Sequence, residues 1–336
     1  MNKIAKTVLM TGTALCAAGV VLSTAGYFAG GKDFTYTSDH MYVSGGNSSS
    51  RKNLAVMKKE QIDDFTKLNV DFEDFDLDIR ISDDDHYYME YKLEKNGRKN
   101  PLTWKDKDGE LTLEESAGGS GSYYITYDLG IFSTHADLTE KKDALNTVIL
   151  YIPEKAQLSE AELQLSDGDL TADQLLCKEM TLELLNGDLM MDKGEFEKFD
   201  AKFSDGDLNV KELQCTDNMQ LKSGNGDVTI KKAELADGQI ALSDGDLQID
   251  NSSFNGDMKI NSSCGDVSVE MKNGSAEKTN IYLKAADGDV DTEGLSRGKS
   301  DNEEDTSVYE NKAGASAPTL NVKCSDGDIT LTESEK

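Results

Sequence analysis

The sequence Ser166-Asp167-Gly168-Asp169-Leu170 returns along the chain at a nearly constant interval. Each copy is centred on a glycine. The first five glycines are separated by steps of 19, 19, 20 and 19 residues, and the later steps are 20, 23 and 39. A period of about 20 residues is typical of a solenoid, in which each repeat buries its apolar face against its neighbours. The turn glycines are Gly168, Gly187, Gly206, Gly226, Gly245, Gly265, Gly288 and Gly327.

Apolar and polar residues alternate around each of these glycines. A leucine, valine or isoleucine stands two residues after the glycine in every copy. A period of two predicts β-strands with one buried and one solvated face. A column of hairpins and a β-helix both fit this pattern, and the even period favours the coil. We therefore predict an all-β fold, a β-solenoid or β-helix with repeats of about 19-20 residues, in which one buried column holds Leu170, Leu189, Leu208, Val228 and Leu247.

Asn-Gly and Asp-Gly pairs mark the corners of the predicted coil. Such pairs accept positive φ, which tight turns require. A second set of glycine corners is expected at Asp237-Gly238 and Asn255-Gly256. Some coils are therefore expected to carry two glycine turns.

The regular copies are preceded by a degenerate one. Asp74–Leu77 matches the repeat, with Phe75 in the place of glycine. Because terminal repeats must protect the open end of a solenoid, we expect residues 65–156 to cap a solenoid formed by residues 157–336. Residues 294–318 are expected to be a loop inserted within one repeat, which accounts for the 39-residue step. Further strands of the cap are predicted at Tyr87–Leu93, Glu110–Leu113, Tyr123–Tyr127 and Val148–Ile152.

The N-terminal segment differs from the rest of the chain. Lys3 and Lys6 precede an uncharged, largely apolar run at residues 8–30. About 20 apolar residues span a bilayer, and lysines ahead of the run place the N-terminus inside. We therefore predict that residues 1–31 are the transmembrane helix of a single-pass protein of the cell membrane. Its C-terminal domain would be extracytoplasmic, with residues 32–64 as a polar linker.

Two further interpretations of this segment stay open. The small-x-small sequence Ser23–Ala25 is of the kind that a cleaved signal peptide needs. Small residues at spacings of three and four would let membrane helices pack and self-associate weakly, although signal sequences are rich in small residues in any case. These recurring residues are Gly12, Cys16, Gly19, Ser23, Gly26 and Gly30.

The chain is strongly acidic, with 64 acidic and 35 basic residues and a net charge of −29. Such a chain repels the phosphates of nucleic acid and of anionic lipid. No nucleic-acid partner is therefore expected, and direct adhesion to anionic lipid is disfavoured. Divalent cations, basic protein surfaces and neutral glycans remain compatible with this charge.

Four cysteines follow the N-terminal segment. Cys177 and Cys215 share a register two repeats apart, which corresponds to about 9.6 Å, whereas a disulfide needs Cα atoms within about 7 Å. Free cysteine often packs as a small hydrophobe. We therefore expect core thiols at Cys177, Cys215, Cys264 and Cys324.

Catalytic motifs are few. The three histidines, His40, His86 and His135, are not spaced as metal ligands. The sequence also lacks a P-loop and a dinucleotide fingerprint. We therefore predict a non-enzymatic protein without a cofactor. The alternative is a glycan-active β-helix enzyme, a lyase or hydrolase of the cell surface, because paired carboxylates can perform glycoside chemistry.

The aspartate after each turn glycine is the candidate constellation. Stacked about 4.8 Å apart, these carboxylates either accept backbone N–H bonds at their own turns or bind calcium through several oxygen ligands. Five copies also carry Asp before the glycine, whereas three carry Asn186, Asn225 or Cys264. A turn accepts Asp and Asn alike, so turn capping is favoured and no metal is expected. The candidate residues are Asp169, Asp188, Asp207, Asp227, Asp246, Asp266, Asp289 and Asp328.

Several motifs resemble a known family. They are Phe65–Val70, Pro101–Trp104, Asp108–Leu113 and Leu150–Pro153, together with the repeated Ser-Asp-Gly-Asp-Leu. With these motifs the chain resembles the bacterial "putative adhesin" β-strand-repeat family, a domain of unknown function. The resemblance implies a membrane-anchored protein of the cell envelope. It would serve as a scaffold, adhesin-like or envelope-stress-associated binding module, with an envelope protein or a glycan as its partner.

Overall fold

The computed structural model describes residues 34–36, 41–43, 54–117, 145–292, 295, 298–303 and 306–334. The chain divides into two units, and the repeats belong to the larger one, Leu54–Ala117 with Lys142–Lys336. The smaller unit contains the antiparallel pair β1 (Phe34–Tyr36) and β2 (Met41–Val43). In the ranges just given, no helix is long and apolar enough to span a membrane, and the predicted transmembrane segment lies outside them.

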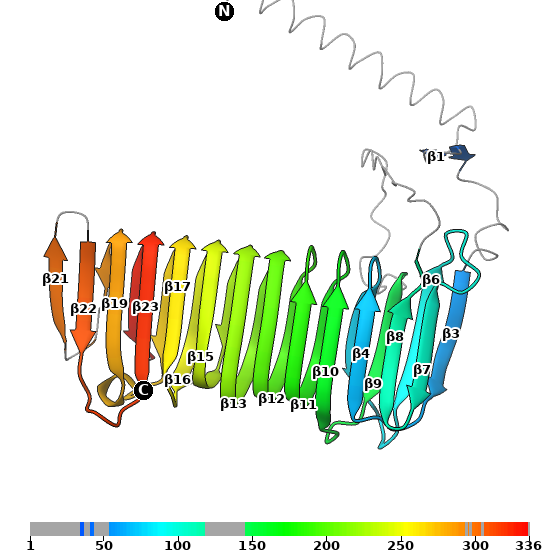
Figure 1. The fold of residues 1–336 in the computed structure, drawn as a ribbon, viewed down its shortest axis with the longest axis horizontal. Coiled ribbons are helices and arrows are strands. Elements are labelled where there is room, and N and C mark those ends of the chain that lie inside the picture. Colours follow the sequence, from blue (N-terminus) through cyan, green and yellow to red (C-terminus); the bar gives the residue numbers. More distant parts are fainter. Residues whose placement is uncertain are drawn as a thin grey trace, which may run out of the picture. The chain divides into compact units, whose positions relative to one another are not determined.

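The regular part of the larger unit is a stack of parallel β-coils, as predicted (Figure 1). Neighbouring rungs pair with a register of 19 or 20 residues. The buried column is confirmed, because Leu170, Leu189 and Leu208 lie opposite one another and are at most 1% exposed. The strands are β10 (Leu158–Leu165), β11 (Leu170–Leu184), β12 (Leu189–Asp205), β13 (Leu208–Asn225), β14 (Val228–Lys231), β15 (Ala233–Asp244), β16 (Leu247–Phe254), β17 (Met258–Cys264) and β18 (Val267–Met271).

Each coil has three buried runs, separated by pairs of exposed or half-buried residues. In β11 the pairs are 173–174 and 178–179, and the turn at 185–188 closes the coil. The predicted second corner is confirmed, since Asp237 lies in the column that contains residue 179 and Gly256 lies one position before that column, next to Ala236. The buried runs of β11 are Leu170 with Ala172, Leu175 with Cys177, and Met180 with Leu182 and Leu184.

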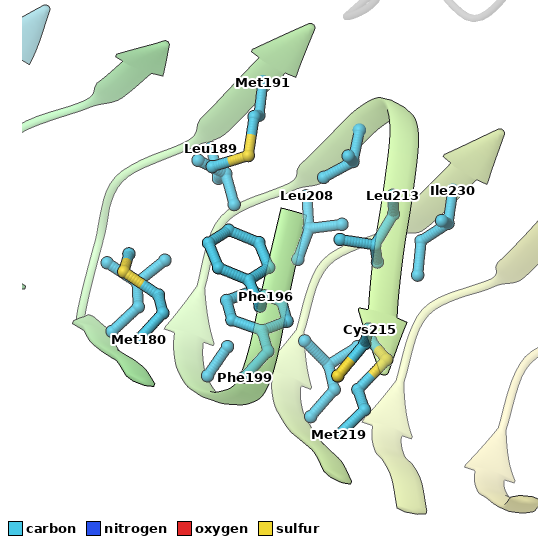
Figure 2. Close-up of a cluster of buried hydrophobic side chains, with 14 of the residues drawn as sticks. Met180, Leu189, Met191, Phe196, Phe199, Leu208, Leu213, Cys215, Met219 and Ile230 are labelled. Atoms are coloured by element: carbon cyan, nitrogen blue, oxygen red, sulfur yellow. The ribbon is translucent and has the colours of Figure 1, made fainter. Parts of the chain in front are cut away.

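Large side chains fill the coil where a glycine leaves space. Gly194 lies in an inward column between Leu175 and Leu213, and a Cβ at this glycine would overlap the ring of Phe196. Phe196 and Phe199 stack with their ring centroids 4.9 Å apart, within the cluster shown in Figure 2. A large side chain in one column of a coil therefore fills the space that a small residue leaves in a neighbouring column, so a single column need not hold residues of one size.

Seven strands form the N-terminal end of the stack. β4 and β5 make the predicted degenerate rung and pair in parallel with β10 and β11. β8 and β9 continue the parallel stack, and β3, β6 and β7 add antiparallel strands. β3 takes up part of the predicted linker, and the strand predicted at Tyr123–Tyr127 lies outside the described residues. The seven are β3 (Leu54–Gln61), β4 (Lys67–Phe72), β5 (Asp76–Ile81), β6 (Tyr88–Glu94), β7 (Leu102–Lys107), β8 (Glu110–Glu115) and β9 (Thr147–Ile152).

At the C-terminal end, the spatial order of the rungs differs from their order in the sequence. β23 pairs in parallel with β17 on one side and with β19 on the other, so that Val322 lies between Ile260 and Leu283. β24 likewise lies between β18 and β20. The last rung of the sequence is thus inserted between two earlier ones, an order that the repeat spacing does not reveal. The elements here are η2 (Ala276–Lys278), β19 (Asn280–Asp287), β20 (Val290–Asp291), β21 (Lys299–Glu303), β22 (Thr306–Asn311), β23 (Thr319–Asp326) and β24 (Ile329–Glu333).

The predicted loop at residues 294–318 contains the strands β21 and β22, so that prediction was wrong for these residues. β22 pairs antiparallel with β19 and β21 pairs antiparallel with β22, which adds a hairpin to the end of the stack. Ser307 and Tyr309 of β22 are buried, at 4% exposure each. The sequence Lys-Ser-Asp-Asn-Glu of β21 misled the prediction because it is polar throughout. Charged residues of this kind protect an edge strand from pairing with other chains.

Three of the four predicted core thiols are confirmed. Cys177, Cys215 and Cys324 are buried and free, and burial raises the pKa of Cys177 to about 12 and of Cys215 to about 11. Cys264 is exposed, so the prediction was wrong there. The physical reason is its position: Cys264 lies opposite Asp326, in the row that precedes the turn glycines, and not in an inward column.

Candidate functional site

Close approach between rungs explains the turn glycines better than backbone conformation does. At each of them, a Cβ would overlap the carbonyl oxygen of the glycine in the neighbouring rung, or of Phe75 at the first rung. Gly168 and Gly187 lie outside the left-handed region, whereas Gly206 has a φ of 137°. The positive φ that we predicted is therefore a feature of only part of the column.

The aspartates after the glycines form a continuous ladder of hydrogen bonds. The backbone N–H of each donates to Oδ1 of the aspartate in the neighbouring rung, at 2.8–3.0 Å. This corrects the capping prediction, because each carboxylate accepts a bond from the next rung and not from its own turn. Asp76 begins the ladder, and burial raises its pKa. The donor–acceptor pairs are Asp169–Asp76, Asp188–Asp169, Asp207–Asp188, Asp227–Asp207, Asp246–Asp227, Asp266–Asp246, Asp328–Asp266 and Asp289–Asp328.

The residues before the glycines alternate between carboxylate and amide over part of the stack. Asn186 Nδ2 donates to Asp167 Oδ1, and Asn225 Nδ2 donates to Asp205 Oδ1, both at 2.6 Å. Because an amide between carboxylates avoids the repulsion of like charges, the interchange of Asp and Asn has a reason beyond turn geometry.

Calcium binding at the aspartate row stays an untested alternative. Within the part of the chain that the structure describes, no group of three or more His, Cys, Asp or Glu side chains is arranged to hold a metal ion. Every carboxylate of the ladder except that of Asp289 already has one oxygen engaged as an acceptor between rungs. The main role of the aspartate row is therefore structural, since its carboxylates hold neighbouring rungs together.

A buried ion pair closes the N-terminal end of the turn column. The side chains of Arg98 and Glu115 are 6% and 2% exposed, and their charged atoms lie 2.7 Å apart. Glu115 Oε2 accepts the backbone N–H bonds of Glu73 and Asp74 at 2.9 and 2.7 Å, and the guanidinium lies 5.3 Å from the centre of the Phe75 ring. Glu115 thus supplies the acceptor that a neighbouring rung supplies elsewhere.

Near the C-terminal end, one face of the stack carries lysines and no carboxylate. It consists of outward positions on β13, β15, β17, β23 and β19, which the register aligns in two adjacent columns. Lys222, Lys259 and Lys323 are exposed there, and Lys284 is half-buried. We call the following ten residues the lysine face: Gln220, Lys222, Gln239, Ala241, Lys259, Asn261, Asn321, Lys323, Tyr282 and Lys284.

The eight corresponding positions on β4, β10, β11 and β12 hold four carboxylates, one lysine and three uncharged residues. The carboxylates are Asp71, Glu162, Glu183 and Asp200, and the lysine is Lys202, which forms an ion pair with Glu183. The uncharged residues are Asn69, Gln164 and Thr181. Along a single face, the charge therefore changes sign between β12 and β13.

A surface hollow of about 430 Å³ adjoins the lysine face. Tyr282 lines it together with Asn280, Glu310 and Lys312. Asn280 holds the neighbouring loop, accepting from the backbone N–H of Gly314 at 3.2 Å and donating to its carbonyl at 2.8 Å. Glu310 and Lys312 form an ion pair at 3.0 Å. Tyr282 thus belongs to both the hollow and the lysine face.

Comparison with solved structures gives three similar chains. A "putative adhesin" from Parabacteroides merdae is 16% identical, with a TM-score of 0.45 over 86% of this chain and 98% of its own. A "putative adhesin" from Bacteroides fragilis is 10% identical, with a TM-score of 0.44 over 84% and 98%. A "putative lipid binding protein" from Parabacteroides distasonis is 11% identical, with a TM-score of 0.43 over 86% and 98%. No curated protein matches the chain.

The model of the Toastrack DUF4097 family matches residues 65–332. The chain belongs to the Toastrack DUF4097 family. The resemblance stated from the motifs between Phe65 and Pro153 is thereby confirmed. The matched residues of the Toastrack domain include the cap, the regular rungs and the inserted C-terminal rung.

Sequence reasoning located the turn glycines and the aspartates of this Toastrack domain but missed three features. Asp76 was seen in a degenerate repeat and not as the start of the ladder, although Asp74–Leu77 carries that signal. The Arg98–Glu115 pair has no motif. The lysine face depends on the inserted rung, which places Lys323 beside Lys284.

Proposed function

We propose that the protein is a non-enzymatic component of the cell envelope. The N-terminal helix anchors it in the membrane, and the solenoid lies outside as a scaffold, adhesin-like or envelope-stress-associated binding module. The anchor is supported by the uncharged run at residues 8–30 behind Lys3 and Lys6. The partner would be an envelope protein or a glycan.

One observation carries the choice of binding over catalysis. The aspartate row was the candidate constellation of the sequence, and its carboxylates already serve as acceptors between rungs. Function is then left to the outward faces, which present side chains at the regular spacing of the rungs. Extended faces of this kind are the surfaces that solenoid proteins use for binding.

The hollow beside Tyr282 favours binding as well. Glycoside hydrolysis uses a pair of carboxylates, and the residues that line the hollow include one, Glu310, which is paired with Lys312. Turnover of cell-wall or capsular polysaccharide by the purified protein would support the enzymatic alternative instead.

Protease treatment of intact cells tests the topology. A full-length chain with a C-terminal tag is expressed, and intact and lysed cells are treated alike. The solenoid should be removed from intact cells, with an internal cytoplasmic protein left uncut as the control. A solenoid that is protected in intact cells and digested only after lysis would refute the proposal.

A further inference from the structure

The lysine face has a charge opposite to that of the whole chain. Its ten outward positions hold four lysines and no carboxylate, while the chain holds 64 acidic against 35 basic residues. Many lysines elsewhere form ion pairs, such as Lys198 with Glu179 and Lys232 with Glu212. Among the described residues, the four lysines of the face have no partner of this kind. Their charges are therefore free to bind an anion.

The other residues of the face suit sugar hydroxyl groups. Gln239, Asn261 and Asn321 offer amide donors and acceptors, and they alternate with the lysines across the two columns. Tyr282 stands at the edge of the hollow, where an aromatic ring can cover the apolar face of a sugar. Lysine, amide and tyrosine groups together match a ligand that carries both acidic groups and hydroxyl groups.

Acidic rows on both sides limit the width of that ligand. Asp257 lies two residues before Lys259, and Asp326 lies three residues after Lys323, which along a strand corresponds to about 7 and 10 Å. Screening acts over about 8 Å at physiological ionic strength. A broad anionic surface, such as a bilayer or a nucleic-acid duplex, would meet these carboxylates, whereas a single polymer chain would not.

The face is also elongated. It crosses five neighbouring strands, from β13 to β19, which is about 19 Å along the stack at the spacing of β-strands. We propose that the lysine face binds a linear, single-chain acidic polysaccharide that runs along the stack. The polymer's acidic groups bind Lys222, Lys259, Lys323 and Lys284, and one sugar ring packs on Tyr282.

This inference rests on the proposed envelope function, and it narrows the partner to one class. It also refines the argument from net charge, which allowed neutral glycans and disfavoured anionic surfaces. At physiological salt the distant carboxylates are screened, so the local charge of the face governs binding at contact.

The test measures binding to the full-length protein in detergent micelles. Polygalacturonate is the acidic polysaccharide, dextran the neutral polysaccharide, and inorganic polyphosphate the polyanion without sugar rings. Polygalacturonate should bind with an affinity that falls as salt rises, and dextran and polyphosphate should bind at least tenfold more weakly. Equal or tighter binding of polyphosphate would overturn the role of the sugar.

Two pairs of substitutions locate the binding site. Lys259→Glu with Lys323→Glu should weaken binding of polygalacturonate more than tenfold. Lys155→Glu with Lys231→Glu makes the same change in net charge at exposed positions elsewhere and should change the affinity less than threefold. An equal loss in both double variants would overturn the assignment to this face.

Tyr282→Ala separates stacking from simple charge attraction. It should weaken the binding of polygalacturonate and leave any residual binding of polyphosphate unchanged. Unchanged binding of both polymers would contradict the role of Tyr282. All variants should melt within a few degrees of the parent, which shows that they are folded.

If protease removes the solenoid from intact cells while polygalacturonate fails to bind, this inference fails and the proposed function stands. If the solenoid is protected, the proposed function fails whatever the polymer does.

Discussion

The middle and the C-terminal end of the Toastrack stack are built from the same repeat but are ordered differently. From β10 to β18 each rung lies on the one before it in the sequence. At the C-terminal end the last rung enters between β17 and β19. The repeat therefore specifies the shape of a coil and its contacts but not which coil is its neighbour.

The same contrast appears in the charge of the outer face. On this face β4, β10, β11 and β12 carry four carboxylates and Lys202, whereas the lysine face on β13, β15, β17, β23 and β19 carries four lysines and no carboxylate. Buried, mostly apolar inward columns support both halves. A solenoid core fixes the inward residues and leaves the outward ones free to differ, and that freedom allows a binding face at one end alone.

The largest effect is expected in the middle of the stack. Leu208→Asp places an unpaired charge at a position that is 1% exposed, which costs several kcal/mol in addition to the lost apolar contacts, about 2–5 kcal/mol. This exceeds much of the usual stability of a domain, about 5–15 kcal/mol, so the solenoid should be unfolded by circular dichroism. The neighbouring, exposed Asn209→Asp is the control and should melt like the parent. A folded Leu208→Asp protein would contradict the buried column.

At the C-terminal end the same substitution should act locally. Val322 is 0% exposed and lies between Ile260 and Leu283. Stability in a solenoid comes from contacts between adjacent rungs. Val322→Asp should therefore unfold β23 and its two paired strands, β17 and β19, while β10 to β13 stay folded. Hydrogen exchange read by mass spectrometry should show protection lost only in this end. The exposed Ser325→Asp is the control, and loss of protection throughout the stack would show that the two regions are not separable.

Two glycine substitutions separate close approach from backbone conformation. Gly168 lies outside the left-handed region but leaves no room for a Cβ beside the Phe75 carbonyl, whereas Gly97 has a φ of 81° and open space around it. Gly168→Ala should lower stability by about 1–3 kcal/mol through overpacking. Gly97→Ala should lower it by about 1 kcal/mol through conformation. Urea unfolding measures both, and the reverse ranking would show that turn conformation dominates.

The smallest effect concerns the row before the glycines. Asn186→Asp replaces the amide that binds Asp167 with a third consecutive carboxylate, which should cost less than about 1 kcal/mol at an exposed site. Like charges raise the pKa of the added carboxyl in the folded state. The loss is therefore present above that pKa and disappears as the pH falls below about 4. Melting at pH 7 and pH 3.5, with Asn209→Asp as the control, checks this, and a loss that persists at pH 3.5 would exclude charge repulsion as the cause.

The sequence predicted the coil because its signals are local. Alternation around Leu170 and its equivalents reports burial directly, and the 19- to 20-residue period reports register. The Asp and Gly rows follow from the same period. What the period cannot report is a contact with a partner off the repeat, such as the Glu115 carboxylate that accepts from Glu73 and Asp74.

The order of the last rungs could not be predicted from the sequence for a related reason. Every rung offers the same kind of parallel edge, so the strand that contains Val322 can pair equally well with the strand of Ile260 and with the strand of Leu283. The hairpin of β21 and β22 pairs with one edge of β19, and β23 pairs with its other edge. The polar residues of β21 resemble a loop in the sequence. The lysine face was missed with it, since Lys323 and Lys284 become neighbours only in this order.

Disulfide formation tests the inserted rung most directly. Ser262 and Ala285 both lie opposite Cys324, on its two sides, at the spacing of adjacent strands, about 4.8 Å, which a disulfide can bridge. In one variant Ser262→Cys is joined to the native Cys324, with Cys264→Ser to remove the exposed thiol. In the other, Ser262→Cys and Ala285→Cys are combined with Cys324→Ser and Cys264→Ser.

Peptide mapping after mild oxidation reads the result. If β23 lies between β17 and β19, an intrachain link should form between positions 262 and 324 in the first variant. No link should form between positions 262 and 285 in the second variant, where two rungs, about 9.6 Å, separate them. A link between 262 and 285 without one between 262 and 324 would mean that the rungs follow the order of the sequence. That result would contradict both the inserted rung and the lysine face it builds.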